Sequence, residues 1–139
     1  MKSIDIHTDG GSRGNPGQAA IGVFIEGDGE IVAKIGKRIG EATNNVAEYS
    51  AVLEAFDFLL KNKNFLQGIQ SINFFMDSQL IYSQITGLYK IKNANLRELL
   101  FKVREKESQI KIPISYNYIN REKNKMADKL VNLALDNML

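Results

Sequence analysis

Alternating hydrophobic and polar positions open the chain and predict a β-strand over residues 3–9. Ile4, Ile6 and Thr8 fall on one face of this strand, and the residues between them fall on the other. The Gly- and Pro-bearing run over residues 10–17 is expected to break regular structure. Residues 19–26 and 30–39 are predicted as two further strands, because the Gly27-Asp28-Gly29 tripeptide between them is a strong hairpin signal. The three strands then form an antiparallel meander.

The hydrophobic period changes after Gly40. Thr43 is a suitable N-cap, and apolar residues follow it at spacings of three and four, which predicts an amphipathic helix that ends within residues 61–64. The apolar positions of this helix are Val46, Tyr49, Leu53, Phe56 and Leu60.

The second half of the chain alternates between predicted helices and strands. Strands are expected over residues 72–76 and 112–119, the latter with Pro113 near its start, where proline is tolerated. Helices are expected over residues 78–85, 96–107 and 124–139. The order β-β-β-α-β-α-α-β-α predicts an α/β fold with a mixed sheet, since helices between the later strands imply crossover connections. The apolar stripe of the last helix is predicted at Met126, Leu130, Leu133 and Ala134.

Size and composition indicate one globular domain over residues 1–139. Apolar residues make up 44% of the chain and charged residues 24%, which is typical of globular proteins. There is no cysteine, no N-terminal signal core and no apolar run of membrane-spanning length, so we expect a cytoplasmic protein without a membrane partner. The net charge of +2 permits a phosphate-rich partner without requiring one.

Four acidic residues lie where a sheet of this kind forms a crevice. Asp9 and Asp77 close predicted strands, and Glu48 and Asp128 lie early in predicted helices. Carboxylates without His or Cys are hard oxygen ligands that suit Mg²⁺ or Mn²⁺. Each acid also has a local explanation: the helix dipole favours Glu48 and Asp128, and Asp9 precedes a turn. The pattern alone leaves both interpretations open.

Four segments around these acids resemble the signature blocks of type 1 ribonuclease H. They are TDGGSRGNPGQAAIG from residue 8, TNNVAEYSAV from residue 43, MDSQL from residue 76 and NREKNKMADKL from residue 120. Together they extend over almost the whole chain. The resemblance implies the ribonuclease H-like fold, an α/β fold with a five-stranded mixed sheet, three antiparallel strands followed by parallel ones, flanked by helices. It also implies an endonuclease that cleaves the RNA strand of RNA–DNA hybrids.

The resemblance assigns metal-binding and catalytic roles to Asp9, Glu48, Asp77 and Asp128. In the family these acids hold two Mg²⁺ ions during catalysis, with Mn²⁺ as a possible substitute, and the products carry a 5′-phosphate. Further positions carry over as substrate contacts, in the loop after the first strand, at the start of the first long helix and after Asp77. These positions are Gly10, Asn15, Thr43, Asn44, Asn45 and Gln79.

Several of these positions have a second interpretation. Thr43 and Asn44 are equally suited to cap the first helix. Asn124, four residues before Asp128, matches a substrate-binding position near the metal ligands, and it is also a candidate N-cap of the last helix.

Two departures from the family pattern stand out. Many members have a histidine in the loop before the last helix, but the only histidine here is His7, inside the first strand, where we expect a structural role. Arg121 stands in that loop, as in an archaeal-like branch of the family. Arginine cannot act as a base near neutral pH, so we expect it to stabilise phosphate charge or to help product leave.

The second departure is that the basic, Trp-containing protrusion of some members is missing from this short form. Lys90 and Lys92 are the candidate contacts to the DNA backbone in its place, or else part of a solvated loop. Two rival functions are cleavage of double-stranded RNA as well as hybrids, and a catalytically silent module that binds hybrids. We expect a monomer without an obligate protein partner.

Overall fold

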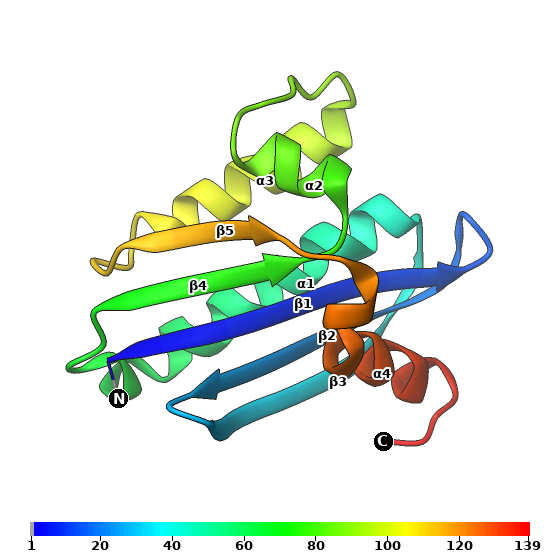
Figure 1. Cartoon of the computed structure of the whole chain (residues 1–139). Helices are drawn as coiled ribbons and strands as arrows, with labels where there is room; N and C mark the ends of the chain where they lie inside the picture. Colours follow the sequence, from blue (N-terminus) through cyan, green and yellow to red (C-terminus); the bar gives the residue numbers. More distant parts are fainter. Residues whose placement is uncertain (1) are drawn as a thin grey trace.

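The computed structural model describes residues 2–139 and contains a five-stranded mixed sheet in the order β3-β2-β1-β4-β5 (Figure 1). β1, β2 and β3 pair antiparallel, whereas β4 pairs parallel to β1 and to β5. The predicted fold class is therefore confirmed. The strands are β1 (Ser3–Arg13), β2 (Gly17–Gly27), β3 (Glu30–Ala42), β4 (Ser71–Met76) and β5 (Ile114–Tyr118).

Helices cover both faces of the sheet. α1 packs on β1 and β2 and is flanked by α3, whereas α4 packs on β2 and β3 from the opposite side. Among the described residues, no helix combines the length and apolar character needed to cross a membrane. The α-helices are α1 (Asn44–Lys61), α2 (Gln79–Ile85), α3 (Ala94–Glu107) and α4 (Lys125–Leu135), and the short 3₁₀ turns are η1 (Lys63–Leu66) and η2 (Arg121–Lys123).

The hairpin between β2 and β3 forms as predicted. Asp28 has φ 52° and Gly29 has φ 78°, so both central residues of the two-residue turn are left-handed. This is the type I′ pattern, whose twist matches that of the two strands. Gly27 and Glu30 pair on either side of it.

Several predicted boundaries are wrong, including those of β1, β3, β5 and α4. β1 does not end at Asp9, because residues 10–13 continue to pair with β2, from Gly10 opposite Ile21 to Arg13 opposite Gln18. The break is therefore confined to residues 14–16. β3 continues to Ala42, which pairs with Gly17.

The other two corrections concern the last strand and the last helix. β5 begins only after Pro113, although the Pro113 carbonyl still accepts a hydrogen bond of 3.0 Å from the Ile72 amide. α4 ends at Leu135 rather than at residue 139. Asn137, with φ 55°, turns the chain so that the Met138 amide donates to the Leu133 carbonyl at 2.8 Å, which closes the helix end.

The helix faces that are buried differ partly from the predicted stripes. Five of the predicted stripe positions are only half-buried: Val46, Leu53 and Leu60 of α1, and Met126 and Leu133 of α4. α1 lies between the sheet and α3, so small residues between the predicted positions are buried as well. The buried residues of α1 are Ala47, Tyr49, Ala51, Val52, Ala55, Phe56 and Leu59, and those of α4 are Ala127, Leu130, Val131 and Ala134.

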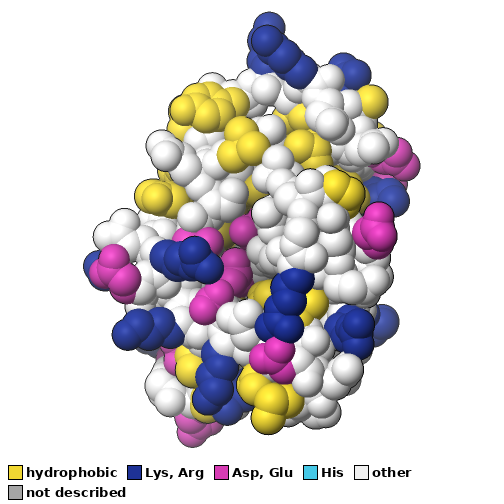
Figure 2. Space-filling view, turned by 90° about the vertical axis from the view of Figure 1, so that its right-hand side faces the viewer, with side chains coloured by type: hydrophobic (Ala, Val, Ile, Leu, Met, Phe, Trp, Pro, Cys, Tyr) yellow, Lys and Arg dark blue, Asp and Glu magenta, His cyan; other side chains and the backbone are white. Residues whose placement is uncertain are grey.

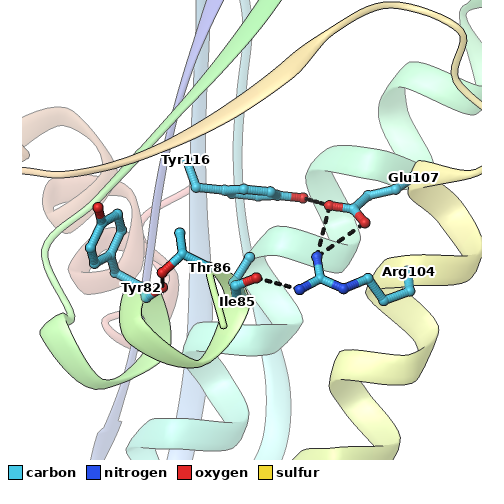
Figure 3. A network of polar contacts seen from close by, with 6 residues as sticks. All are labelled: Tyr82, Ile85, Thr86, Arg104, Glu107 and Tyr116. Carbon is cyan, nitrogen blue, oxygen red and sulfur yellow. Dashed lines mark hydrogen bonds and ion pairs between the residues drawn. The ribbon is translucent and has the colours of Figure 1, made fainter. Parts of the chain in front are cut away.

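A polar network fixes α2, which begins two residues after Asp77, against α3 and β5 (Figure 3). The Tyr116 hydroxyl donates to the Glu107 carboxylate, and this carboxylate accepts two hydrogen bonds of 3.1 Å from Arg104. Arg104 also donates to the Ile85 carbonyl in the last turn of α2. Burial, and next the neighbouring Glu107, raise the pKa of Tyr116 well above its ordinary value.

Candidate active site

The parallel ladder between β1 and β4 ends beside two of the predicted metal ligands. Thr8 and Met76 form the last pair of this ladder, and Asp9 and Asp77 are the residues that follow them in the sequence. Asp77 leaves β4 at its carboxyl end, whereas Asp9 lies within β1 and pairs with Gly22 of β2. The two acids therefore start from neighbouring positions at one edge of the parallel pair, where ligand crevices form in sheets of this kind.

Glu48 reaches the same place because α1 lies unusually close to β1. Thr43 caps α1, and its hydroxyl accepts a hydrogen bond of 3.2 Å from the Val46 amide. A Cβ at Gly10 would stand 2.3 Å from the backbone carbonyl of Ala47. Only glycine permits this approach, so buried Gly10 sets the spacing between strand and helix.

Three of the four predicted carboxylates form one cluster. Asp9, Glu48 and Asp77 each offer an oxygen, and these atoms all lie within 4.8 Å of one another. The cluster lines a cavity of about 400 Å³, which also contains Asp128 and Arg121. Figure 2 shows acidic side chains in a hollow of this face, with basic side chains at its margin.

The electrostatics of the cluster favour a cation. Burial, and next the charges of Asp77 and Asp128, raise the pKa of Asp9 to about 8. Burial, followed by Asp9 and Asp77, also raises the pKa of Glu48 well above its ordinary value, against the smaller opposite effects of the Gly10 amide and Arg121. Crowded carboxylates of this kind become stable in their charged form when a cation neutralises them. Carboxylate oxygens at this spacing suit a hard divalent ion.

Asp128 and Arg121 form the outer part of the site. Asp128 is in the first turn of α4 and lies close enough to Asp9 to raise the pKa of that residue, although it is not one of the three clustered acids. An Arg121 guanidinium nitrogen lies 3.8 Å from an Asp128 oxygen, and its side chain is 83% exposed. Such an exposed pair contributes little to stability, which leaves Arg121 available to a ligand.

α4 can carry Asp128 to the sheet because Gly22 lies beneath it. A Cβ at Gly22 would stand 2.2 Å from the Ala127 carbonyl oxygen. The strand residue opposite Asp9 and the helix residue before Asp128 are therefore in direct backbone contact.

The predicted substrate contacts at the start of α1 lie beside the cavity and are linked to one another. Asn15 accepts a hydrogen bond of 3.0 Å from the Asn44 amide. The Asn44 side-chain oxygen accepts from both the amide and the hydroxyl of Ser12, at 2.9 and 3.1 Å, so Asn44 does not cap α1. Asn44 lines the cavity, and Asn45 is half-buried in the same turn of the helix.

The remaining predicted contacts lie outside the carboxylate cavity. Gln79 is the exposed first residue of α2, which Ser78 caps. Lys90 lines a separate, largely apolar groove beside α3, and Lys92 is exposed in the same loop. His7 is also outside the cavity: its ring stacks on that of Phe75 at 4.9 Å, and burial lowers its pKa.

Six residues that line the cavity were missed by the sequence reasoning, and three of them have polar side chains: Ser12, Arg13 and Asn132. Ser12 and Arg13 were assigned to a break in regular structure, but they are the last residues of β1. Asn132 lies four residues after Asp128 and donates a hydrogen bond of 3.1 Å to the Asp128 carbonyl. The helical spacing of four residues was the signal that could have identified it.

The chain is similar to several known proteins. The family model described as reverse transcriptase-like matches residues 7–134. Ribonuclease HI of Halobacterium salinarum is 40% identical over 134 residues, which cover 96% of this chain and 64% of that protein. A bifunctional protein of Mycobacterium tuberculosis is 37% identical over 98% of this chain, which spans only 36% of its length. This chain thus spans between about one third and two thirds of these two relatives.

A solved structure shares the fold of this chain over almost the whole length of both proteins. LC11-RNase H1, isolated from compost by a metagenomic approach, superposes with a TM-score of 0.92 at 41% identity, covering 99% of this chain and 98% of that one. The same protein in complex with an RNA/DNA hybrid gives a TM-score of 0.89 at 40% identity, with 96% and 97% of the two chains covered.

Proposed function

Because this chain belongs to the ribonuclease H family and its structural neighbours are of type 1, we propose that it is an endoribonuclease that hydrolyses the RNA strand of RNA–DNA hybrids. The observation that carries this proposal is the cluster of Asp9, Glu48 and Asp77, whose oxygens lie within 4.8 Å of one another in an open cavity. The hybrid-bound relative, at a TM-score of 0.89, supports the choice of substrate.

The cofactor we propose is Mg²⁺, with Mn²⁺ as a substitute, held by Asp9, Glu48, Asp77 and Asp128. The residues fit this group: they are oxygen ligands only, and the pKa of Asp9 is raised to about 8 by burial and by neighbouring negative charge. Two ions bound here would supply Lewis-acid stabilisation of the charge that develops on the phosphate and on the attacking and leaving oxygens. Cleavage of this kind leaves a 5′-phosphate.

The chain itself positions the substrate strand and neutralises its charge. Asn15 and Thr43 are proposed to hold a phosphate. The Asn15 side chain accepts a hydrogen bond from the backbone amide of Asn44, and Thr43 is the residue before Asn44. Asn44, Asn45 and Gln79 are proposed to contact bases and sugars in the minor groove, where the RNA 2′-hydroxyl is exposed. Because Gly10 is buried against α1, it contributes to substrate binding by setting the spacing of the site rather than by an extensive contact with the substrate.

Basic residues around the cavity are proposed to contact phosphates. Arg121, at the rim, would stabilise phosphate charge or help product leave, since its guanidinium is exposed beside Asp128. Lys90 and Lys92 would contact the DNA backbone, an electrostatic interaction that weakens with added salt. We further propose a monomer, since a single chain contributes all four carboxylates to the site. We also propose a cytoplasmic location, which the lack of cysteine in the sequence fits.

The test is cleavage of a labelled hybrid by the unaltered protein and by Asp77→Asn in Mg²⁺. Asp77→Asn is expected to abolish cleavage and to retain the circular dichroism spectrum of the parent. Asp57→Asn is the matched control, because Asp57 pairs with Lys106 and does not line the cavity. Full activity in Asp77→Asn would contradict the proposal.

Two more substrates separate the rival functions. RNA duplex and DNA duplex are incubated beside the hybrid, each with Mg²⁺ and with Mn²⁺. Cleavage of the hybrid alone supports the proposal as stated, and additional cleavage of RNA duplex would broaden the substrate class. Binding of the hybrid without cleavage in either metal would show a catalytically silent module instead.

A further inference from the structure

The Asn124 side chain links β1 to the residue after β4 at the point where the hydrogen-bonded ladder between these two strands ends. After the last pair, Thr8 and Met76, the Met76 carbonyl accepts a hydrogen bond of 2.9 Å from the Ile119 amide. The Thr8 carbonyl accepts instead from the side-chain nitrogen of Asn124, also at 2.9 Å. The same nitrogen donates to an Asp77 carboxylate oxygen at 3.1 Å. The side-chain amide of Asn124 therefore links Thr8 of β1, the residue before Asp9, to Asp77, the residue that follows β4.

The orientation of this amide is fixed by its surroundings. Both hydrogens of the Asn124 nitrogen face acceptors, the Thr8 carbonyl and the Asp77 carboxylate. Rotation of the amide by half a turn would place its oxygen against these two acceptors, which is repulsive. The side-chain oxygen of Asn124 therefore faces neither the Thr8 carbonyl nor the Asp77 carboxylate. It is buried and has no hydrogen-bond donor within the described residues 2–139.

An unpaired buried acceptor destabilises a folded protein, because it has lost its hydrogen bonds to water without replacing them. Asn124 is 1% exposed, so bulk water does not satisfy its oxygen. Such a group in a native fold calls for an explanation, and here the two hydrogen bonds that the side-chain nitrogen donates supply one.

The side chain of Asn124 does not make the helix-capping hydrogen bond that its position predicts. It stands at the N-cap of α4, but its side chain makes no capping hydrogen bond. Its backbone carbonyl accepts a hydrogen bond of 3.1 Å from the Asp128 amide, which starts the turn that carries Asp128. The side chain thus acts on Asp77 and β1 while the backbone places the fourth carboxylate. Its exposed fraction of 1% is inconsistent with the direct substrate contact that the sequence suggested.

We infer that Asn124 is a positioning residue of the metal site: its side-chain amide ties the Asp77 carboxylate to the end of β1, in a metal-ligating position. This inference rests on the proposed metal-dependent function. Groups that orient metal ligands in this way typically change metal affinity by about 10–100-fold when they are removed.

The test measures metal binding rather than turnover. Titration calorimetry with Mn²⁺ is run on the unaltered protein, on Asn124→Ala and on Asn62→Ala, a matched control. Asn62 follows α1, 14 residues after Glu48 in the chain, and its side-chain amide donates to the Phe58 carbonyl. We expect Asn124→Ala to bind Mn²⁺ about 10–100-fold more weakly and Asn62→Ala to match the parent.

Thermal unfolding with and without Mn²⁺ separates positioning from a structural role. A structural role alone would lower Tm by the same amount in both conditions, whereas positioning predicts that Asn124→Ala gains less from the metal than the parent does. Equal Mn²⁺ affinity in Asn124→Ala and the parent would overturn the inference while leaving the proposed function intact. Absence of Mn²⁺ binding by the parent would overturn both.

A measurement on the unaltered protein covers the case in which Asn124→Ala does not fold. The side-chain amide signals of Asn124 and Asn62 are followed by NMR during titration with Mg²⁺. The Asn124 signals are expected to shift and to saturate together with metal binding, and those of Asn62 are expected to stay in place. Unchanged Asn124 signals at saturating Mg²⁺ would overturn the inference.

Discussion

Gly10 and Glu48 are in backbone contact across the interface of β1 and α1. A Cβ at Gly10 would stand 2.5 Å from the Glu48 backbone nitrogen, a distance that real Cβ atoms essentially never show. The residue after one clustered carboxylate, Asp9, therefore determines how closely the next one, Glu48, can approach. The cluster depends on this absence of a side chain as much as on the carboxylates themselves.

Gly10→Ala should therefore both destabilise the fold and weaken the site. Since the clashing atoms belong to the backbone of α1, the helix must move outward, and we expect a loss of about 1–3 kcal/mol in the free energy of unfolding. Urea denaturation measures this loss, and Mn²⁺ titration measures the effect on the site.

Gly11→Ala is the matched control for stability. A Cβ at Gly11 would meet only a methyl group of Val131 at 3.7 Å, which is an ordinary contact. Equal stability of the two variants would contradict the role of Gly10 in setting the spacing.

The metal-free protein should lose stability as the pH rises from about 4 to about 8. Folded Asp9, with its pKa raised to about 8, keeps its proton over this window, whereas the unfolded chain releases it near the ordinary value of 3.8. The folded state then binds more protons, so the free energy of unfolding falls with increasing pH. The raised pKa of Glu48 acts in the same direction.

Thermal unfolding in the presence of a chelator measures this slope, and Asp9→Asn isolates its source. Asp9→Asn should flatten the loss of stability, and Mg²⁺ should reduce it by stabilising the charged carboxylates. A parent protein whose Tm declines no more than that of Asp9→Asn over this window would show that the Asp9 carboxyl is not buried among negative charges as the structure describes.

Much of this site could be predicted from the sequence, and what could not depends on distances between chain segments. Asp9, Glu48 and Asp77 stand in recognisable blocks, and the hairpin at Asp28 follows from local turn chemistry. The continuation of β1 to Arg13 was missed, because glycines that signal a break by themselves are held extended here by pairing with β2. Tertiary pairing overrides local preference in such cases.

The hydrogen-bond partners of Asn124 could not be predicted from the sequence for a related reason. The sequence suggested either a cap of the last helix or a substrate contact near the metal ligands. The actual partners of Asn124 are Thr8 and Asp77, which lie 116 and 47 residues away in the chain. Only the fold brings these groups together.

Arg121→Ala should reduce turnover of the hybrid and leave stability nearly unchanged. The Arg121 side chain is 83% exposed and its nitrogen lies 3.8 Å from Asp128, so the free energy of unfolding should change by less than about 0.5 kcal/mol. Arg121→Lys keeps the positive charge and should retain more activity than Arg121→Ala. Steady-state cleavage of the hybrid provides the measurement, and unchanged turnover in Arg121→Ala would remove Arg121 from the mechanism.

Tyr116→Phe should destabilise the protein without affecting metal binding. The Tyr116 hydroxyl donates to Glu107, which also binds Arg104, so its removal takes a hydrogen bond from a half-buried carboxylate. A hydrogen bond to a charged group contributes about 1.5–3 kcal/mol, and we expect a loss of that size in urea denaturation. Tyr118→Phe, two residues further along β5 and 45% exposed, is the matched control and should be nearly neutral. If Tyr116→Phe were as stable as Tyr118→Phe, the network would not be what fixes α2 and α3 to β5; if it lost Mn²⁺ affinity as well, the network would also control the position of Asp77.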